Sequence, residues 1–393
     1  MQKIVFKYDF DIPINRRNTN SLKWDVAEHE LPMWVADMDF KAAPEIQAAI
    51  QERAAHGVFG YSVIPDEWYQ AYIDWWQRRH GLTIQKEWLF FCTGVIPAIS
   101  STIRKLTTPA EKVLIQTPVY NMFFNCIMDN GRQVTENSLR YIDGRYEIDF
   151  EDLEQKLSDP QTSLMLLCNP HNPVGKIWDK ETLEKIGELC WKYHVLVLSD
   201  EIHCDLTDPG TEYIPFASVS EKCRENSITC IAPTKTFNLA GLHTAAVMIP
   251  NSSLRHKVRR ALNTDGVAGA NTFAVDAAVA AFTKGEAWLE ELRMYIFENK
   301  KRTIEFVKEN IPQIRVVPSC ATYLLWLDCS KLPISAAEVA RQIRNKTGLF
   351  LSQGGQYGSA GETFLRMNIA CPRPTLEDGL KRLQEGIVCS ILS

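Results

Sequence analysis

The 393-residue sequence predicts an α/β fold in which a mostly parallel sheet is flanked by helices, followed by a smaller α+β domain. The prediction rests on short apolar runs in the middle of the chain, on segments with helical spacing between several of them, and on a change of pattern after residue 285. Strands that are apolar throughout are typical of a parallel sheet buried on both faces.

The apolar runs are the expected strands, because each is short and ends at turn-forming or polar residues. They comprise residues 112–115, 163–168, 195–200, 227–232 and 244–249. Residues 181–193 illustrate the helices between them. Asp179 is placed to cap this helix, and one face carries Leu183, Ile186, Cys190 and Tyr193.

The C-terminal part has a different pattern. From Glu286 a long helical segment begins, and two strands with helices between them follow, in the stretches TYLLWLD and FLRMNIA. We therefore expect a large domain at 45–285 and a small domain made of 1–44 and 286–393, with a boundary near Gly285.

Composition excludes several classes of partner. The formal net charge of -5 and the pI near 6.0 leave no basic stripe for nucleic acid or for an anionic membrane surface. No run approaches the ~18 apolar residues of a membrane span, and the first residues lack the pattern of a signal peptide. The eleven cysteines form no C-x-x-C pair and mostly lie in apolar runs, which is typical of reduced core thiols. We expect a cytoplasmic protein.

Polar side chains follow four of the expected strands. Tyr120, Asn172, Asp200 with His203, and Lys235 each come shortly after an apolar run. Ligands of open α/β sheets bind beyond the carboxyl ends of the strands, so these residues are the candidate site.

The stretch TGVIPAIS, from Thr93 to Ser100, predicts an anion site at the start of a helix. Gly94 precedes the helix and Pro97 fits its first turn, so the opening N–H groups are free to bind a phosphate. An isolated Thr-Gly pair also occurs as a simple turn, and that alternative stays open.

Asp200 ends a strand that we expect to be deeply buried, where a carboxylate needs a cation or a strong donor. A protonated pyridine nitrogen would serve. A metal site built from Asp200, His203, Cys204 and Asp205 is the alternative, but its spacing matches no zinc pattern. His203 could also be an ordinary loop histidine.

Lys235 lies between a short apolar run and a stretch of small residues. A lysine that is partly desolvated and near a cationic ring has a lowered pKa and can form a Schiff base with a carbonyl cofactor. A solvated surface lysine is the common alternative. The order of the candidate residues along the chain favours the cofactor site: the helix start after Gly94, then Tyr120, Asn172, Asp200, Lys235 and, late in the chain, Arg366.

Six ordered motifs resemble the fold-type I pyridoxal-5'-phosphate enzymes of the aspartate aminotransferase superfamily. They are TGVIPAIS, TPVYNMFF, NPHNPVG, SDEIHCD, TKTFNLAGL and FLRMNIACP. The stretch WVADMDF at 34–40 and the histidine in DEIH resemble the MalY/PatB branch, which comprises cysteine-S-conjugate β-lyases, including cystathionine β-lyases. The resemblance extends from Trp34 to Pro372 and implies the fold-type I architecture.

The resemblance also implies roles for the site residues. Lys235 would hold pyridoxal 5'-phosphate through a Schiff base and later remove the substrate Cα proton, while Asp200 would pair with the pyridinium nitrogen. Tyr120 would stack on the ring and take part in catalysis. Further cofactor contacts would come from Val95, Ile96, Thr234, Asn172 and His203. Tyr61 of a neighbouring subunit in a homodimer would reach the cofactor phosphate. Substrate contacts would come from Arg366, as a carboxylate clamp, from Asn172 and from the same Tyr61.

The implied activity is α,β-elimination from L-cystathionine, L-cysteine or related cysteine S-conjugates to thiol, pyruvate and ammonia. Many aminotransferases have other residues where this chain has His203, His243 and Ala232, which weakens a transaminase interpretation. An aminotransferase of neutral or aromatic amino acids remains an alternative, as does a MalY-like regulatory binding protein. Beyond the amino-acid substrate and a second copy of the chain, the sequence predicts no metal, nucleic acid or membrane partner.

Overall fold

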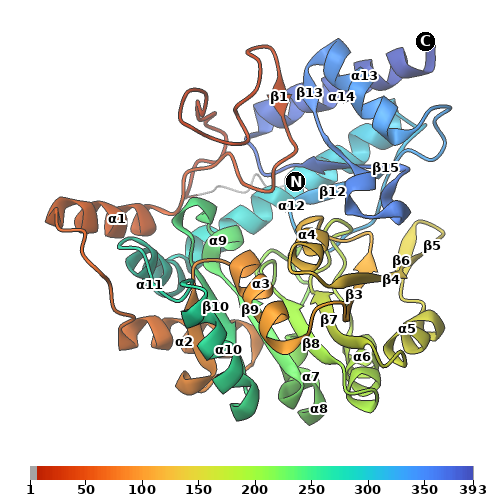
Figure 1. The fold of residues 1–393 in the computed structure, drawn as a ribbon. Helices are drawn as coiled ribbons and strands as arrows, with labels where there is room; N and C mark the ends of the chain where they lie inside the picture. Colours follow the sequence, from red (N-terminus) through yellow and green to blue (C-terminus); the bar gives the residue numbers. More distant parts are fainter. Residues whose placement is uncertain (1–6, 393) are drawn as a thin grey trace.

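The computed structural model describes residues 7–392, and side chains up to residue 388. Residues 1–6 and 393 of the predicted small domain therefore lie outside the described residues. Figure 1 shows a large sheet flanked by helices, with a smaller sheet and its own helices beside it. The predicted α/β fold class with a mostly parallel sheet is confirmed.

The large sheet has seven strands in the order β2-β10-β9-β8-β7-β3-β4. All five predicted strands belong to it, and β10 is the antiparallel member. The strands are β2 (Leu89–Cys92), β3 (Lys112–Thr117), β4 (Gln133–Ser138), β7 (Thr162–Cys168), β8 (Leu196–Asp200), β9 (Ser227–Ile231) and β10 (Ala245–Met248).

Helices cover both faces of this sheet, because successive strand residues point to opposite sides. In β3, Val113 and Ile115 pack in the cluster of one face, whereas Leu114 packs in the cluster of the other. The first face is covered by α3 (Val95–Leu106), α4 (Met122–Met128) and α10 (Ser252–Thr264). The second is covered by α5 (Phe150–Leu157), α6 (Lys180–Lys192), α7 (Phe216–Val219) and α8 (Glu221–Glu225).

Helix α6 forms where the spacing predicts it. Asp179 accepts a hydrogen bond from the backbone N–H of Thr182 at 2.8 Å, as expected of an N-cap. Leu183, Ile186 and Cys190 are buried, which is the face that the sequence indicates.

The second sheet has four antiparallel strands, in the order β11-β12-β15-β14. They are β11 (Arg315–Val316), β12 (Leu324–Asp328), β14 (Ser352–Gln353) and β15 (Phe364–Asn368). Three helices accompany them, α12 (Glu286–Asn310), α13 (Ala336–Thr347) and α14 (Arg373–Leu392). The N-terminal segment joins this part of the molecule, since β1 (Leu31–Pro32) pairs with β13 (Leu349–Phe350).

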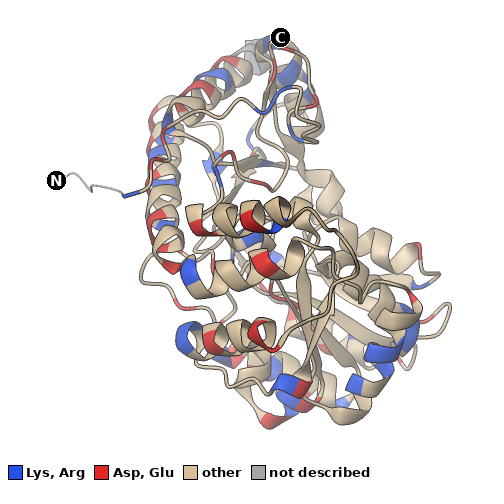
Figure 2. Ribbon diagram, turned by 90° about the vertical axis from the view of Figure 1, so that its left-hand side faces the viewer, with Lys and Arg blue, Asp and Glu red and all other residues tan. Residues whose placement is uncertain are grey.

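Short elements complete the chain. A hairpin is formed by β5 (Arg140–Ile142) and β6 (Arg145–Glu147). The 3-10 turns are η1 (Lys86–Trp88), η2 (Ala240–Leu242), η3 (Gly354–Tyr357) and η4 (Ser359–Gly361). In Figure 2 the charged residues lie mainly on the outer helices, whereas the strands are largely uncharged.

An aromatic cluster joins α2 (Asp66–His80) and α11 (Ala274–Lys284) to the large sheet, and α1 (Pro44–His56) packs in the same core through Ile46. Phe282 of α11 lies at its centre. Its ring centroid is within 4.7–6.0 Å of those of Tyr72, Trp75, Trp76 and Phe237. Such ring pairs add to the free energy of burial, so this cluster is a major part of the core.

Within residues 7–392, no helix combines the length and the apolar character needed to cross a bilayer. Every cysteine whose side chain is described is a free thiol, and all of these except Cys320 are buried.

We predict that Phe282→Ala lowers the free energy of unfolding by about 3–5 kcal/mol, because it removes a fully buried ring and leaves a cavity. Chemical denaturation of the two proteins measures the difference. Ile304→Ala, at a position 40% exposed on α12, is the control and should change it by less than about 0.5 kcal/mol. Equal effects of the two substitutions would contradict the importance of the cluster.

Candidate active site

The predicted site residues Asp200 and Lys235 follow neighbouring parallel strands. Asp200 is the last residue of β8 and lies in register with Cys230 of β9. One turn of helix, α9 (Pro233–Thr236), begins two residues after β9 ends and carries Lys235. The fold therefore brings the two side chains to the carboxyl edge of the large sheet, where ligands of such sheets bind.

The Lys235 amine is partly buried and donates a hydrogen bond to the carbonyl oxygen of Ala36 at 2.6 Å. Burial lowers the pKa of Lys235 to about 8, and the positive charge of Arg366 acts in the same direction. The carboxylates of Asp37 and Asp200 oppose this shift in pKa. An appreciable fraction of the amine is therefore neutral, and hence nucleophilic, near neutral pH.

Asp200 is 5% exposed and accepts a hydrogen bond from the backbone N–H of Ile202 at 3.1 Å. Burial raises its pKa to about 7, although that hydrogen bond and the charge of Lys235 act against the rise. No described residue forms an ion pair with this carboxylate within 4 Å. Ionisation is thus costly until a cation or a strong donor arrives.

His203 and Tyr120 are both neutral in this site. Burial, together with the charges of Lys235 and Arg366, lowers the pKa of His203 to about 3. Its Nδ1 atom is buried and has no hydrogen-bond partner among the described residues. Burial raises the pKa of Tyr120 to about 12, and its ring lies edge-on to Phe123.

Arg366 projects from β15 of the small sheet and is 5% exposed. Its Nη1 donates to Oδ1 of Asn172 at 3.1 Å, and its Nη2 donates to the carbonyl oxygen of Trp34 at 2.9 Å. Its Nε is buried and has no partner within the described part of the chain. The Nε edge of the guanidinium is therefore available, and it has the geometry for a bidentate carboxylate.

The predicted anion site is the N-terminus of α3. Val95 and Ile96 open this helix, and no described side chain caps it. Backbone N–H groups at such an end favour an anion. Gly94 directly precedes them with an extended backbone (φ 164°), a conformation that other residues also adopt. Thr234 is buried within α9.

Residues 34–39 form a strap that borders the site, and its contacts, which join segments far apart in the chain, were not predicted. The Ala36 carbonyl oxygen accepts from Lys235 and also from the hydroxyl of Tyr323 at 3.0 Å. Asn368 donates to the carbonyl oxygens of Val35 and Asp37, each at 2.6 Å. The strap thus holds backbone acceptors against the lysine.

A buried ion-pair network fixes the far end of the strap. Lys23 is 1% exposed, and its Nζ lies 2.6 Å from Oδ2 of Asp39. Arg16 pairs with both Asp37 and Asp39 at 2.7 Å. Asn238, three residues after Lys235, bonds the backbone of Met38 and Phe40, so the strap and the lysine-bearing segment are also tied directly.

Tyr61 and His243 are not part of this cluster. Tyr61 lies in the loop between α1 and α2, which runs along the edge of the molecule in Figure 1, and it is fully exposed. Val58, Phe59 and Val63 of the same loop are also more than half exposed. His243 is exposed and directly follows η2.

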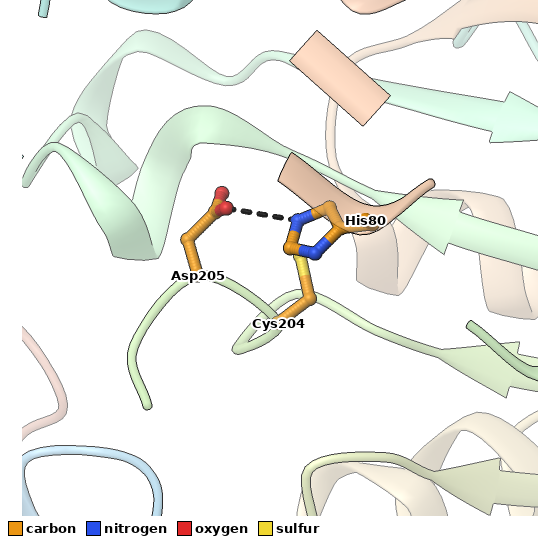
Figure 3. A group of neighbouring side chains, drawn as sticks. All are labelled: His80, Cys204 and Asp205. Carbon is orange, nitrogen blue, oxygen red and sulfur yellow. Dashed lines mark hydrogen bonds and ion pairs between the residues drawn. The ribbon is translucent and has the colours of Figure 1, made fainter. Parts of the chain in front are cut away.

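The structure does not form the metal site considered from the DEIHCD stretch. Among the described residues, Cys204 and Asp205 gather with His80 instead (Figure 3), and this group does not include Asp200 or His203. Asp205 accepts a hydrogen bond from His80 Nε2 at 3.0 Å, and Arg79 Nε lies 3.4 Å from it. A carboxylate already paired with a guanidinium is a poor ligand for a further cation.

The sequence profile of the class I and II aminotransferases matches residues 33–383. The chain is 43% identical to the cystathionine β-lyase PatB of Bacillus subtilis, over 96% of this chain and all of that protein. It is similar in structure to cystalysin from Treponema denticola, which contains pyridoxal 5'-phosphate (TM-score 0.93, 32% identity, 98% and 100% of the two chains). It is also similar to the pyridoxal-phosphate-bound C-S lyase of Staphylococcus hominis (TM-score 0.91, 32% identity, 97% and 98%).

We predict that Lys235 of cofactor-free protein reacts with an acylating reagent with a midpoint near pH 8, since burial and Arg366 lower the pKa of its amine. Mass spectrometry of labelled peptides across pH measures this, and the exposed Lys308 in the same digest controls for the reagent. Arg366→Met should move the Lys235 midpoint to higher pH, because removing a positive charge favours the protonated amine. A midpoint above about pH 10, the range of an ordinary exposed lysine, would contradict the prediction.

Proposed function

Because the chain belongs to the class I and II aminotransferase family, we propose that it is a pyridoxal-5'-phosphate-dependent carbon-sulfur β-lyase. It cleaves L-cystathionine, L-cysteine or related cysteine S-conjugates to thiol, pyruvate and ammonia. The observation that carries the proposal is the Lys235 amine of lowered pKa, which shares the edge of the large sheet with the buried Asp200. The buried Arg366 of the small sheet is close enough to contribute to that lowered pKa. The cystathionine β-lyase and C-S lyase among its relatives support the reaction class.

The residues present fit the cofactor. Asp200 is a buried carboxylate without a cationic partner within 4 Å among the described residues, which suits a protonated pyridine nitrogen. His203 has a buried Nδ1 without a partner, and the start of α3 has no side-chain cap. Asp200 would pair with the ring nitrogen, and His203 would bond the ring oxygen. The start of α3 would bind the phosphate.

When bound, pyridoxal 5'-phosphate supplies an aldehyde for a Schiff base and a ring that accepts electrons from the substrate Cα. Lys235 holds the cofactor, and its released amine takes the Cα proton. An amine with a pKa near 8 is well matched to this transfer near neutral pH. Asp200 keeps the proton on the ring nitrogen.

The remaining residues orient the two molecules. Arg366 binds the substrate α-carboxylate through its free Nε edge while Asn172 and the Trp34 carbonyl hold the other guanidinium nitrogens. Tyr120 packs against the ring. Val95 and Ile96 offer their N–H groups to the phosphate, together with the Thr234 hydroxyl.

Elimination and transamination would use the same residues. The two reactions differ in whether the sulfur substituent on the substrate Cβ is released. Elimination releases a thiol without a keto-acid acceptor, whereas transamination requires one. The exposed His243, at a position where many aminotransferases carry an arginine, favours the lyase. The family match leaves an aminotransferase of neutral or aromatic amino acids as the second candidate.

Assembly, organisation and location complete the proposal. The exposed apolar loop that carries Tyr61 supports a homodimer in which this tyrosine reaches the neighbouring site. A large domain at 45–285 is supported by the seven-stranded sheet, and a small domain of 1–44 and 286–393 by the pairing of β1 with β13. A cytoplasmic location is supported by the free buried thiols.

We predict that the purified protein, loaded with cofactor, forms pyruvate and a free thiol from L-cystathionine in the absence of any keto acid. A coupled assay for pyruvate and a thiol reagent measure the two products. Turnover that depends on a keto-acid acceptor, without pyruvate from L-cystathionine alone, would instead identify an aminotransferase.

Two variants, Lys235→Ala and Asp200→Ala, are compared with the native protein in the same L-cystathionine assay. Lys235→Ala should abolish turnover and the visible absorption of the linked cofactor, because no other amine replaces it. Asp200→Ala should lower kcat by at least about 10²-fold, since the ring nitrogen loses the group that keeps it protonated. Near-normal rates in either variant would refute the role of that residue.

We predict that subunits lacking Lys235 and subunits lacking Tyr61 complement one another. In a mixed dimer of Lys235→Ala and Tyr61→Ala, one of the two sites receives both native residues. Random reassociation should therefore restore about a quarter of the native activity from two nearly inactive proteins. Activity that does not rise on mixing would contradict a Tyr61 contribution across the interface.

A further inference from the structure

Asp205 is a buried carboxylate that the steps above do not use. Its side chain is fully shielded from solvent, and it lies five residues after the end of β8. Figure 3 shows its hydrogen bond with His80 at the end of α2. Trp75 Nε1, five residues earlier in α2, donates to it at 3.1 Å. Asp205 thus fixes the loop after Asp200 to the end of α2.

The same carboxylate reaches the helix that carries Lys235. The hydroxyl of Thr236 donates to Oδ2 of Asp205 at 3.2 Å. Thr236 is fully buried and adjacent to Lys235 in α9. Since α9 is a single turn, its own backbone hydrogen bonds do little to hold its direction. An outside contact at Thr236 therefore has a large influence on where Lys235 points.

Aromatic packing also holds the end of α9, through Phe237. The Phe237 ring, next after Thr236, lies 5.8 Å from the Trp75 ring and 6.1 Å from the Trp288 ring. It fits against the backbone at Gly285, where an added Cβ would lie 2.6 Å from its Cε1. Trp75 therefore contacts both Asp205 and Phe237, so a hydrogen bond and a ring contact hold the end of α9.

We propose that Asp205 is a positioning residue that sets the orientation of Lys235 through the hydroxyl of Thr236. The inference rests on the proposed role of Lys235 as the reacting amine. The carboxylate joins the two segments that bear the catalytic groups, the loop after β8 with Asp200 and the one-turn helix with Lys235. Sub-ångström control of a reacting amine is worth large factors in rate.

The charge of Asp205 suits this role. Burial acts to raise its pKa, but the hydrogen bond from His80, the nearby Arg79 and the Trp75 indole outweigh burial, and the pKa is lowered overall. Asp205 therefore stays ionised, and hydrogen bonds to an ionised acceptor are stronger than those between neutral groups. The hydroxyl of Thr236 is accordingly held more firmly than by a neutral acceptor.

Three substitutions test the proposal in the cofactor-loaded protein. Thr236→Val removes the hydroxyl and keeps the shape, whereas Thr236→Ser keeps the hydroxyl. Thr303→Val is the matched control, because Thr303 is equally buried and its hydroxyl donates to the backbone carbonyl oxygen of Asn299 within α12. Three quantities are measured: kcat and KM with L-cystathionine, the pH midpoint of the cofactor absorption without substrate, and the thermal midpoint.

Thr236→Val should lower kcat by about 10-fold or more with KM within about 3-fold, and should shift the absorption midpoint by at least about 0.5 pH units. Thr236→Ser should stay within about 3-fold of the native kcat. Thermal midpoints of Thr236→Val and Thr303→Val should be alike. The proposal is overturned if Thr236→Val matches Thr303→Val in kcat and absorption midpoint, or if Thr236→Ser is as impaired as Thr236→Val.

Asp205→Asn tests the other partner of the same hydrogen bond with the same readouts, and it should shift the absorption midpoint in the same direction as Thr236→Val. A native midpoint and a native kcat in this variant would also overturn the proposal. The absorption readout requires only the link between Lys235 and the cofactor. If the native protein forms no pyruvate from L-cystathionine, the lyase proposal fails while the shift in midpoint still decides the role of Asp205.

Discussion

The cost of keeping a lysine amine away from bulk water is the constraint on which the site depends. A buried ammonium is expensive, so Lys235 has a lowered pKa and needs an acceptor. The backbone carbonyl of Ala36 provides one, and it remains an acceptor at every pH. The positive charge of Arg366 favours the neutral amine, while Asp37 and Asp200 keep the shift in its pKa moderate. The opposing charges leave the amine close to balance between its two forms.

Each part of the molecule contributes one kind of group to this balance. The large sheet presents Asp200 and Lys235 at its carboxyl edge, the small sheet presents Arg366, and the N-terminal strap presents carbonyl oxygens. Arg366 contacts both other parts, through Asn172 and through Trp34. A substrate carboxylate bound to Arg366 therefore meets a group already held from two sides, and little ordering is left to occur on binding.

Much of this arrangement follows from local sequence. The apolar runs predicted the central strands, and the polar residues after them predicted the edge that carries Asp200 and Lys235, because both signals lie within a few residues. Contacts between distant segments gave no such signal. The pairing of Tyr323 with Ala36 joins residues 287 positions apart. Asp205 was considered only as a metal ligand, since its partners Trp75, His80 and Thr236 come from other elements.

The strap has an evolutionary consequence. Lys235 and Ala36 are 199 positions apart, and Lys23 and Arg16, which anchor the strap, are further still. Selection can thus adjust the basicity of the amine by substitutions near the beginning of the chain, without altering any residue that contacts a ligand. The effect of such a change depends on what occupies the distant partner positions. A replacement at the beginning of the chain is therefore read out near residue 235, through backbone contacts and not through a ligand.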